Sequence, residues 1–97
     1  LPGRAAQFAA YRIAQEALTN VVRHARATRA VVAVERLGDE LLLTVDDDGS
    51  GVDDAVEGSG ILGMRERAAL LGGSVELGPS PRGGTRVTAR LPWGAVS

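Results

Sequence analysis

Residues 41–51 read LLLTVDDDGSG, an apolar run that gives way to three acids and then to glycines. Successive side chains of a strand point to opposite faces of a sheet, so Leu41, Leu43 and Val45 predict one apolar face. The alternation continues to Asp47, whose carboxylate we expect on the same core-facing side, where it must find hydrogen-bond donors. Three adjacent acids also repel one another, so something should compensate their charge. The segment predicts a strand over 41–47 that ends in a buried acid.

The segments before this strand predict a helix followed by a hairpin. Residues 29–37 read as a strand, and the Gly/Asp turn at 38–40 predicts an antiparallel hairpin with 41–47. Residues 5–26 are rich in good helix formers, and apolar side chains recur there at four-residue intervals, which predicts one helix. The apolar stripe consists of Ala9, Ile13, Ala17 and Val21.

The segments after the strand predict a loop, a second helix and two more strands. Glycines, acids and serine dominate 48–60, and residues 61–71 read as a helix that Gly72-Gly73 ends. Residues 74–78 and 85–91 read as strands. This order is not the alternation of strand and helix that builds a parallel sheet. We expect an α+β fold, a two-layer α/β sandwich whose helices cover one face of a mixed, mostly antiparallel sheet.

Size and composition bound the function. The 97 residues suffice for one compact domain over 1–97, and with a single Phe, Tyr and Trp its core should be aliphatic. A net charge of -1 argues against a nucleic-acid partner, and the absence of cysteine excludes disulfides and thiolate metal sites. No apolar run approaches the ~20 residues that span a bilayer. The chain begins at Leu1 without a signal-peptide pattern, so we expect a fragment of a longer protein.

The first helix carries a polar constellation. Glu16, Asn20 and His24 follow at four-residue spacing, with Arg23 beside the histidine, so they share one edge of the helix. A carboxylate and an amide oxygen one turn apart can hold Mg²⁺, with waters and phosphate oxygens completing its shell. Arg23 and His24 could then meet phosphates. The alternative is a solvated polar face.

The acidic strand end offers a second constellation. Asp47 could accept a hydrogen bond from the exocyclic amine of a purine, and Gly49 and Gly51 remove side chains where a ring would need close backbone approach. The alternative is an acidic turn or a calcium loop. The calcium reading is weak, because the EF-hand spacing and its final Glu are absent.

Glycines open the second helix and precede the last strand. Gly58, Gly60 and Gly63 would leave free N–H groups at a helix start, which favours a phosphate. A dinucleotide fingerprint has similar spacing but needs a strand immediately before it, and plain loop glycines are the third reading. In the Gly83-Gly84-Thr85 stretch, the Thr85 hydroxyl could reach a base or a bridging water, although a plain hairpin turn is the simpler reading. Together the constellations suit a purine base, a triphosphate and Mg²⁺.

The ordered set of motifs resembles the GHKL ATPases, a superfamily that includes histidine kinases, gyrase and MutL. The resemblance covers nearly the whole chain. Residues 16–25, EALTNVVRHA, resemble the asparagine-containing helix motif, and residues 47–51, DDGSG, resemble the DxGxG motif. Residues 58–67, GSGILGMRER, resemble the second glycine motif of the nitrate-sensor-like (NarL-type) histidine kinases, and residues 83–85 match the last short motif.

The resemblance implies a role for each motif residue. Asn20 would bind Mg²⁺, Asp47 would accept from the adenine amine, and Thr85 would support the adenine site. In the ATP-hydrolysing members, a Glu four residues before the Asn activates water. In a histidine kinase, Glu16 at that position would organise the metal or a water. Arg23 and His24 would contact phosphate or ribose, and Gly58, Gly60 and Gly63 would let the backbone approach the phosphates. Gly49 and Gly51, the glycines of the DxGxG motif, would belong to the nucleotide site.

The resemblance also implies a reaction. The chain would bind Mg·ATP and transfer the γ-phosphoryl group to a histidine on a separate dimerisation domain in two-component signalling. Its partners would be that domain and a downstream response regulator. The parent would be a homodimer, with this domain in the cytoplasm and a membrane anchor as one option. The alternatives are another GHKL ATPase, an anti-sigma serine kinase, or a degenerate module that binds nucleotide without catalysis.

Overall fold

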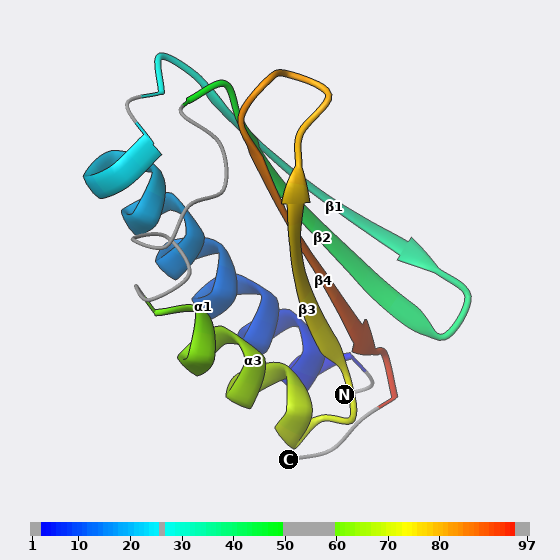
Figure 1. Ribbon diagram of the computed structural model, residues 1–97. Helices are drawn as coiled ribbons and strands as arrows, with labels where there is room; N and C mark the ends of the chain where they lie inside the picture. The colour runs from blue at the N-terminus through cyan, green and yellow to red at the C-terminus, as the bar shows by residue number, and fades with distance from the viewer. Residues whose placement is uncertain (1–2, 26, 50–59, 95–97) are drawn as a thin grey trace.

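The computed structural model describes residues 3–25, 27–49 and 60–94, with the backbone alone at residues 24 and 25. Four strands pair in the order β1-β2-β4-β3, and each pair of neighbours is antiparallel. Helices α1 and α3 lie together on one face of this sheet (Figure 1). The α+β two-layer expectation is confirmed, and in the described part of the chain the sheet is antiparallel throughout. The elements are α1 (Arg4–Asn20), η1 (Val21–Ala25), β1 (Ala30–Leu37), β2 (Glu40–Asp47), α3 (Ile61–Leu70), β3 (Ser74–Pro79) and β4 (Thr85–Pro92).

The first two strands form the predicted hairpin. Leu37 pairs with Glu40, so two residues make the turn, and Gly38 occupies it at a φ of 60° that an L side chain rarely adopts. The Trp93 N–H donates to the Asp39 carbonyl at 2.6 Å, which ties the end of β4 to this turn.

Helix α1 buries a stripe of small and branched side chains. Ala9, Ile13 and Ala17 are buried against the sheet, as their spacing predicts, and alanines let the helix approach closely. The helix does not run unbroken to residue 26, because after Asn20 it continues as one wider π-helical turn, η1. Two consecutive β-branched residues begin that turn and have modest α-helix propensity. A wider turn rotates the following residues, so the four-residue spacing that joins Glu16 to Asn20 does not extend in register to His24.

The core between the two layers is aliphatic, as predicted. Its largest fully buried side chains come from four different elements and are Ile13, Leu43, Met64 and Leu91. Phe8 and Tyr11 are both more than 60% exposed, and Trp93 only packs against the edge of the core. Each fully buried aliphatic side chain stabilises the fold by roughly 1.5–3 kcal/mol.

Helix α3 has glycines at both ends. Gly60 precedes it at a φ of 83° and Gly72 follows it at a φ of 81°. The N–H groups of Gly72 and Gly73 donate to the carbonyls of Ala69 and Ala68, which satisfies the last turn and confirms the predicted stop. None of the described helices is long and apolar enough to cross a membrane.

Three chain segments meet at the end of the sheet that is uppermost in Figure 1. There β2 ends, β4 begins, and the C-terminal turns of α1 and η1 lie alongside. Because β2 and β4 are antiparallel neighbours, the last residues of β2 lie beside the first residues of β4, with Asp46 opposite Arg86. The fold therefore brings Asp47 and Thr85, 38 residues apart in sequence, to one place.

Candidate functional site

A small pocket lies between α1 and the sheet at this end. Its lining combines an apolar wall with three polar residues, Asn20, Asp47 and Thr85, which are all buried. The apolar wall consists of Ala17, Val21, Val45, Met64, Leu77 and Val87. A few polar groups placed in an apolar lining are typical of a site for a small organic ligand.

The described backbone donors hold Asp47 through one of its two oxygens. Its Oδ1 accepts from the N–H of Gly49 at 2.8 Å and from the N–H of Thr85 at 3.2 Å. Asp47 is 4% exposed, and no residue that the structure describes donates to Oδ2. As expected from the strand alternation, the side chain lies on the same face as Leu43 and Val45. One carboxylate oxygen is thus fixed, and nothing in the described part of the chain competes with a ligand for the other.

Two further polar atoms of this pocket are buried and unpaired. Asn20 Oδ1 and Thr85 Oγ1 have no hydrogen-bond partner among the described groups. An unsatisfied buried polar atom costs about 1–3 kcal/mol, so native proteins keep few of them, and those that remain call for an explanation. The orphaned atoms lie around the same pocket as Asp47, and a ligand or ion bound there would pair them.

Gly84, directly before Thr85, packs on Asp47 and was not among the predicted site residues. A Cβ on Gly84 would overlap Asp47 Oδ1 and would lie 2.6 Å from the Gly49 nitrogen. The backbone of the β3–β4 loop therefore touches the Asp47 carboxylate directly. The doubled glycine before Thr85 was the available signal, but a hairpin turn explains such a pair equally well.

The glycines of α3 differ in their surroundings. A Cβ on Gly60 would come within 2.6 Å of Glu16 Cδ, so the start of α3 packs on the Glu16 side chain. A Cβ on Gly63 would meet no atom within 4 Å. Since packing does not require a glycine at position 63, its missing side chain leaves open space above the first turn of the helix.

Glu16 and Asn20 line different cavities. Glu16 borders an outer groove between α1 and α3, together with Arg12, Gly63 and Arg67, whereas Asn20 borders the inner pocket. The structure thus does not bring the expected metal pair into one cavity, and Asn20 is buried instead of lying on a solvated face. No group of three His, Cys, Asp or Glu residues that could hold a metal occurs in the described part of the chain.

The other predicted site residues are placed in part or not at all. The side chain of Arg23, on η1, is exposed. The side chain of His24 and the whole of Gly51 and Gly58 lie outside the described residues.

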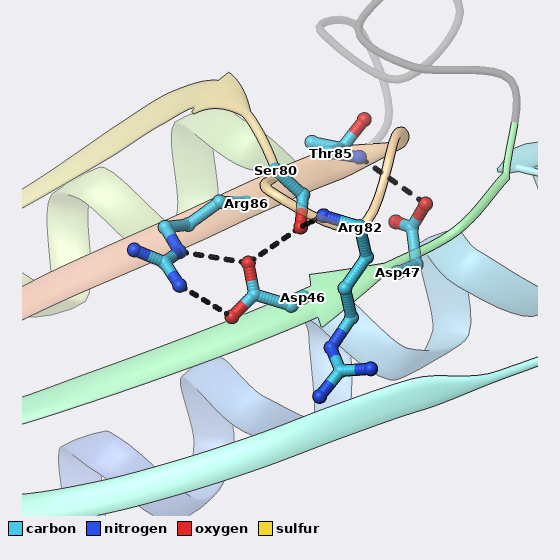
Figure 2. Close-up of polar contacts among 6 residues, drawn as sticks. All are labelled: Asp46, Asp47, Ser80, Arg82, Thr85 and Arg86. Atoms are coloured by element: carbon cyan, nitrogen blue, oxygen red, sulfur yellow. Dashed lines mark hydrogen bonds and ion pairs between the residues drawn. The ribbon is translucent and has the colours of Figure 1, made fainter.

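On the opposite face of the sheet, Arg86 and Ser80 compensate the charge of Asp46 (Figure 2). Its Oδ1 accepts from Arg86 Nε at 2.7 Å and from the Ser80 hydroxyl at 2.8 Å, and its Oδ2 accepts from Arg86 Nη2 at 3.0 Å. The Arg86 bonds, helped by Ser80, hold the pKa of the Asp46 carboxyl below its usual range. The same pair raises the pKa of Arg86.

Donors in the segment before β1 compensate the charge of Asp48. Its Oδ2 accepts from the Thr28 hydroxyl at 2.6 Å, and its Oδ1 accepts from the N–H groups of Thr28 and Arg29. The hydroxyl bond from Thr28 is the main cause of a lowered pKa for Asp48. The three adjacent acids thus have three separate sets of donors, and Asp47 alone faces the pocket.

The chain matches a family of ATPases over almost its whole length. The family described as histidine kinase-, DNA gyrase B- and HSP90-like ATPase matches residues 5–95. Among solved structures, the ATP binding domain of PrrB from Mycobacterium tuberculosis superposes with a TM-score of 0.73 at 28% sequence identity. That superposition covers 88% of this chain and 66% of the PrrB chain.

Curated relatives of the chain are named as sensor kinases. Sensor histidine kinase YxjM of Bacillus subtilis is 39% identical over 82 residues, which cover 84% of this chain and 20% of that protein. Signal transduction histidine-protein kinase/phosphatase UhpB of Salmonella typhimurium is 39% identical over 84 residues, which cover 84% of this chain and 16% of that protein. The chain thus spans about a fifth of the length of these relatives.

Proposed function

Because this chain belongs to the family of histidine kinase-, DNA gyrase B- and HSP90-like ATPases, we propose that it binds Mg·ATP and donates the γ-phosphoryl group to a histidine on a separate dimerisation domain. The observation that carries the proposal is the carboxylate of Asp47. It is buried in an apolar pocket, two backbone N–H groups fix its Oδ1, and no described residue donates to its Oδ2. The names of the sensor histidine kinases that it resembles favour this reaction over other chemistry.

The inner pocket marks the adenine site; its volume here is only about 10 Å³, room for one water, so its lining must open to admit the ring. The Asp47 Oδ2 accepts from the exocyclic amine of adenine, a group that guanine and hypoxanthine lack at that ring position. Thr85 Oγ1, unpaired in the same pocket, bonds to a ring nitrogen or to a bridging water. The aliphatic side chains of Val45, Met64 and Val87 contact the faces of the ring.

Asn20 is the residue that fits Mg²⁺. Its unpaired, buried amide oxygen is a hard ligand of the kind that Mg²⁺ accepts, and phosphate oxygens and waters fill the other positions. When bound, the ion neutralises charge on the phosphates. Glu16 borders the outer groove, from which its carboxylate would order water near a bound Mg²⁺.

The phosphates lie at the first turn of α3. The free N–H groups there and the positive end of the helix dipole favour an anion. The open space at Gly63 lets phosphate approach the backbone, with Gly58 and Gly60 before it, and Arg23 and His24 bind phosphate or ribose from the side of η1. The acceptor imidazole then forms a bond to the γ-phosphorus, the bond from that phosphorus to the β–γ bridging oxygen breaks, and ADP leaves. The protein positions the reactants and neutralises their charge.

The finer assignment is the nitrate-sensor-like (NarL-type) subfamily of histidine kinases. The sequence GMRER at 63–67 and the short segment between Gly51 and Gly58 support it. As part of such a kinase, the domain works in a homodimeric parent, on the cytoplasmic side where ATP is present, and the phosphoryl group passes on to a response regulator. A membrane anchor would belong to another part of the parent.

Titration calorimetry with four ligands tests the binding step. The chain is titrated with ATP in the presence and absence of Mg²⁺, with inosine triphosphate (ITP), which carries an oxygen in place of the adenine amine, and with NAD. We expect ATP to bind most tightly in the presence of Mg²⁺, ITP more weakly, and NAD not at all. Equal affinity for ATP and ITP would remove the adenine role of Asp47, and absence of ATP binding would overturn the proposal.

Acid lability of the product tests the transfer step. The chain is mixed with the histidine-bearing dimerisation domain of its parent and with γ-labelled ATP, and the labelled protein is treated with acid and with base. Phosphohistidine is lost in acid, whereas phosphoserine survives it. Label that survives acid would point instead to a serine kinase, and release of phosphate without labelled protein would point to a hydrolysing ATPase.

A further inference from the structure

The loop between β3 and β4, residues 80–84, is attached to both faces of the sheet. On the pocket side, Gly84 packs on the Asp47 carboxylate and the Thr85 N–H donates to Asp47 Oδ1. On the far side, the Ser80 hydroxyl donates to Asp46 Oδ1 at 2.8 Å. Figure 2 shows the two carboxylates on either side of β2, with the loop reaching both.

Ser80 links Asp46 to the rest of the loop. Its Oγ accepts from the Arg82 N–H at 3.1 Å, its N–H donates to the Gly84 carbonyl at 2.8 Å, and its carbonyl accepts from the Gly83 N–H at 3.0 Å. The residue is buried, so water does not compete for these bonds. A displacement of Ser80 therefore shifts Gly84 and Thr85, which both touch Asp47 from this side.

Arg86 fixes the position of Asp46 itself. It lies directly opposite on β4 and donates two bonds to the carboxylate, which is the strong bidentate arrangement of an arginine and an acid. Asp46 is 6% exposed, so this pair is shielded from solvent on the side of the acid. The chain of contacts runs from Arg86 to Asp46, Ser80, Gly84 with Thr85, and then Asp47.

We propose that Asp46, with Ser80 and Arg86, is a positioning device for base recognition. It holds the 80–84 loop so that the Thr85 N–H fixes Asp47 Oδ1 and turns Oδ2 toward the exocyclic amine of the base. Asp46 never touches the nucleotide. This inference rests on the proposed adenine site, and it assigns a function to the one acid of the triplet that faces away from that site.

The test compares three variants of the chain by calorimetry with ATP and ITP. Ser80→Ala removes the link to the loop and keeps the Asp46–Arg86 pair, and Asp46→Asn removes the charge at constant shape. Glu40→Gln is the matched control, because Glu40 pairs with Arg90 across the same two strands, at 3.7 Å, at the opposite end of the sheet. We expect the first two variants to lose roughly three- to tenfold in ATP affinity, as the loss of one or two hydrogen bonds implies. Their affinity for ITP should stay unchanged, so their preference for ATP over ITP should fall. The Glu40→Gln variant should keep the preference of the parent.

Hydrogen exchange at one amide gives a readout that needs no nucleotide. The Thr85 amide should exchange faster in Ser80→Ala and Asp46→Asn than in Glu40→Gln, relative to the Ala89 amide on the same strand. If the parent chain prefers ATP over ITP and the two variants keep that preference, this inference is overturned and the proposed function stays intact. A parent that binds ATP and ITP with equal affinity overturns this inference together with the adenine role of Asp47, and a parent that binds no ATP overturns the proposed function as well.

Discussion

Asp46 and Asp47 are consecutive on β2, yet their carboxylates lie on opposite faces of the sheet and both bind the loop that begins β4. Asp46 is satisfied by Arg86 and Ser80, with both of its oxygens bonded. Among the described residues, Asp47 has donors to one oxygen, which leaves the other for a ligand. The pleat of the strand thus divides two identical side chains into a structural acid and a recognition acid.

Replacing Asp47 by Asn should weaken ATP binding by roughly tenfold or more, since an amide placed there can turn its NH₂ toward the adenine amine and leave a donor facing a donor. ITP binding should improve, because the same NH₂ can donate to the oxygen that ITP carries in place of the amine. Calorimetry with both nucleotides measures the difference. Asp39→Asn, in the exposed β1–β2 turn, is the control for the same chemical change. Similar losses for ATP and ITP would show that the carboxylate does not read the base.

Gly84→Ala should destabilise the domain by about 1–3 kcal/mol, because the methyl group has to displace the Asp47 carboxylate or the Gly49 backbone. Gly78→Ala meets no atom within 4 Å and should stay within about 0.5 kcal/mol of the parent. Denaturant unfolding, followed by the fluorescence of Trp93, measures both. A Gly84→Ala protein as stable as Gly78→Ala would mean that the loop does not sit against Asp47.

Gly63→Ala should raise stability and lower nucleotide affinity. Glycine in a helix interior costs about 0.5–1 kcal/mol relative to alanine, and nothing crowds the added methyl group. The same methyl would block a phosphate that approaches the first turn of α3. Ala69→Gly, exposed on the same helix, makes the reverse change away from the site and should lower stability without affecting binding. A stabilised Gly63→Ala chain with unchanged ATP affinity would place the phosphates elsewhere.

Asn20→Ala should remove most of the gain in ATP affinity that Mg²⁺ provides. Its cost in stability should be modest, about 1 kcal/mol, because the substitution also deletes an unpaired buried acceptor. Calorimetry at fixed ATP with and without Mg²⁺ gives the comparison. Gln7→Ala, an exposed amide at the other end of α1, is the control. If Asn20→Ala kept the full effect of Mg²⁺, the metal ligands would have to be other groups.

The Asp46–Arg86 pair predicts an acid-sensitive term in stability. The pKa of Asp46 is lower in the folded state than in the unfolded chain, where it is about 3.9, so the folded state favours the ionised form. The contribution is complete above the unfolded pKa and is lost as the pH falls through the folded pKa. The stability gap between the parent and Asp46→Asn should therefore be constant from about pH 5 to 7 and shrink below about pH 4. Thermal unfolding across this range measures it, and a gap independent of pH would contradict the assignment.

Most of the fold follows from local patterns. The alternation over 41–47, the Gly-Asp turn and the glycine pair after α3 each predict a feature that the structure has, because each depends on neighbours in sequence. The change from α1 to the π-helical turn at Val21 was not predicted, since two adjacent valines lower helix propensity only slightly and also occur inside regular α-helices.

The sequence by itself determined the elements, their order, the aliphatic core and the side of the sheet that Asp47 faces, because periodicity and turn chemistry act over a few residues. Only the tertiary structure decided which groups share a cavity. It buried Asn20 beside Asp47 and Thr85, moved Glu16 to the outer groove, and brought Ser80 to Asp46 across 34 residues. Such contacts depend on strand order and on the distance between layers, which one-dimensional spacing does not encode.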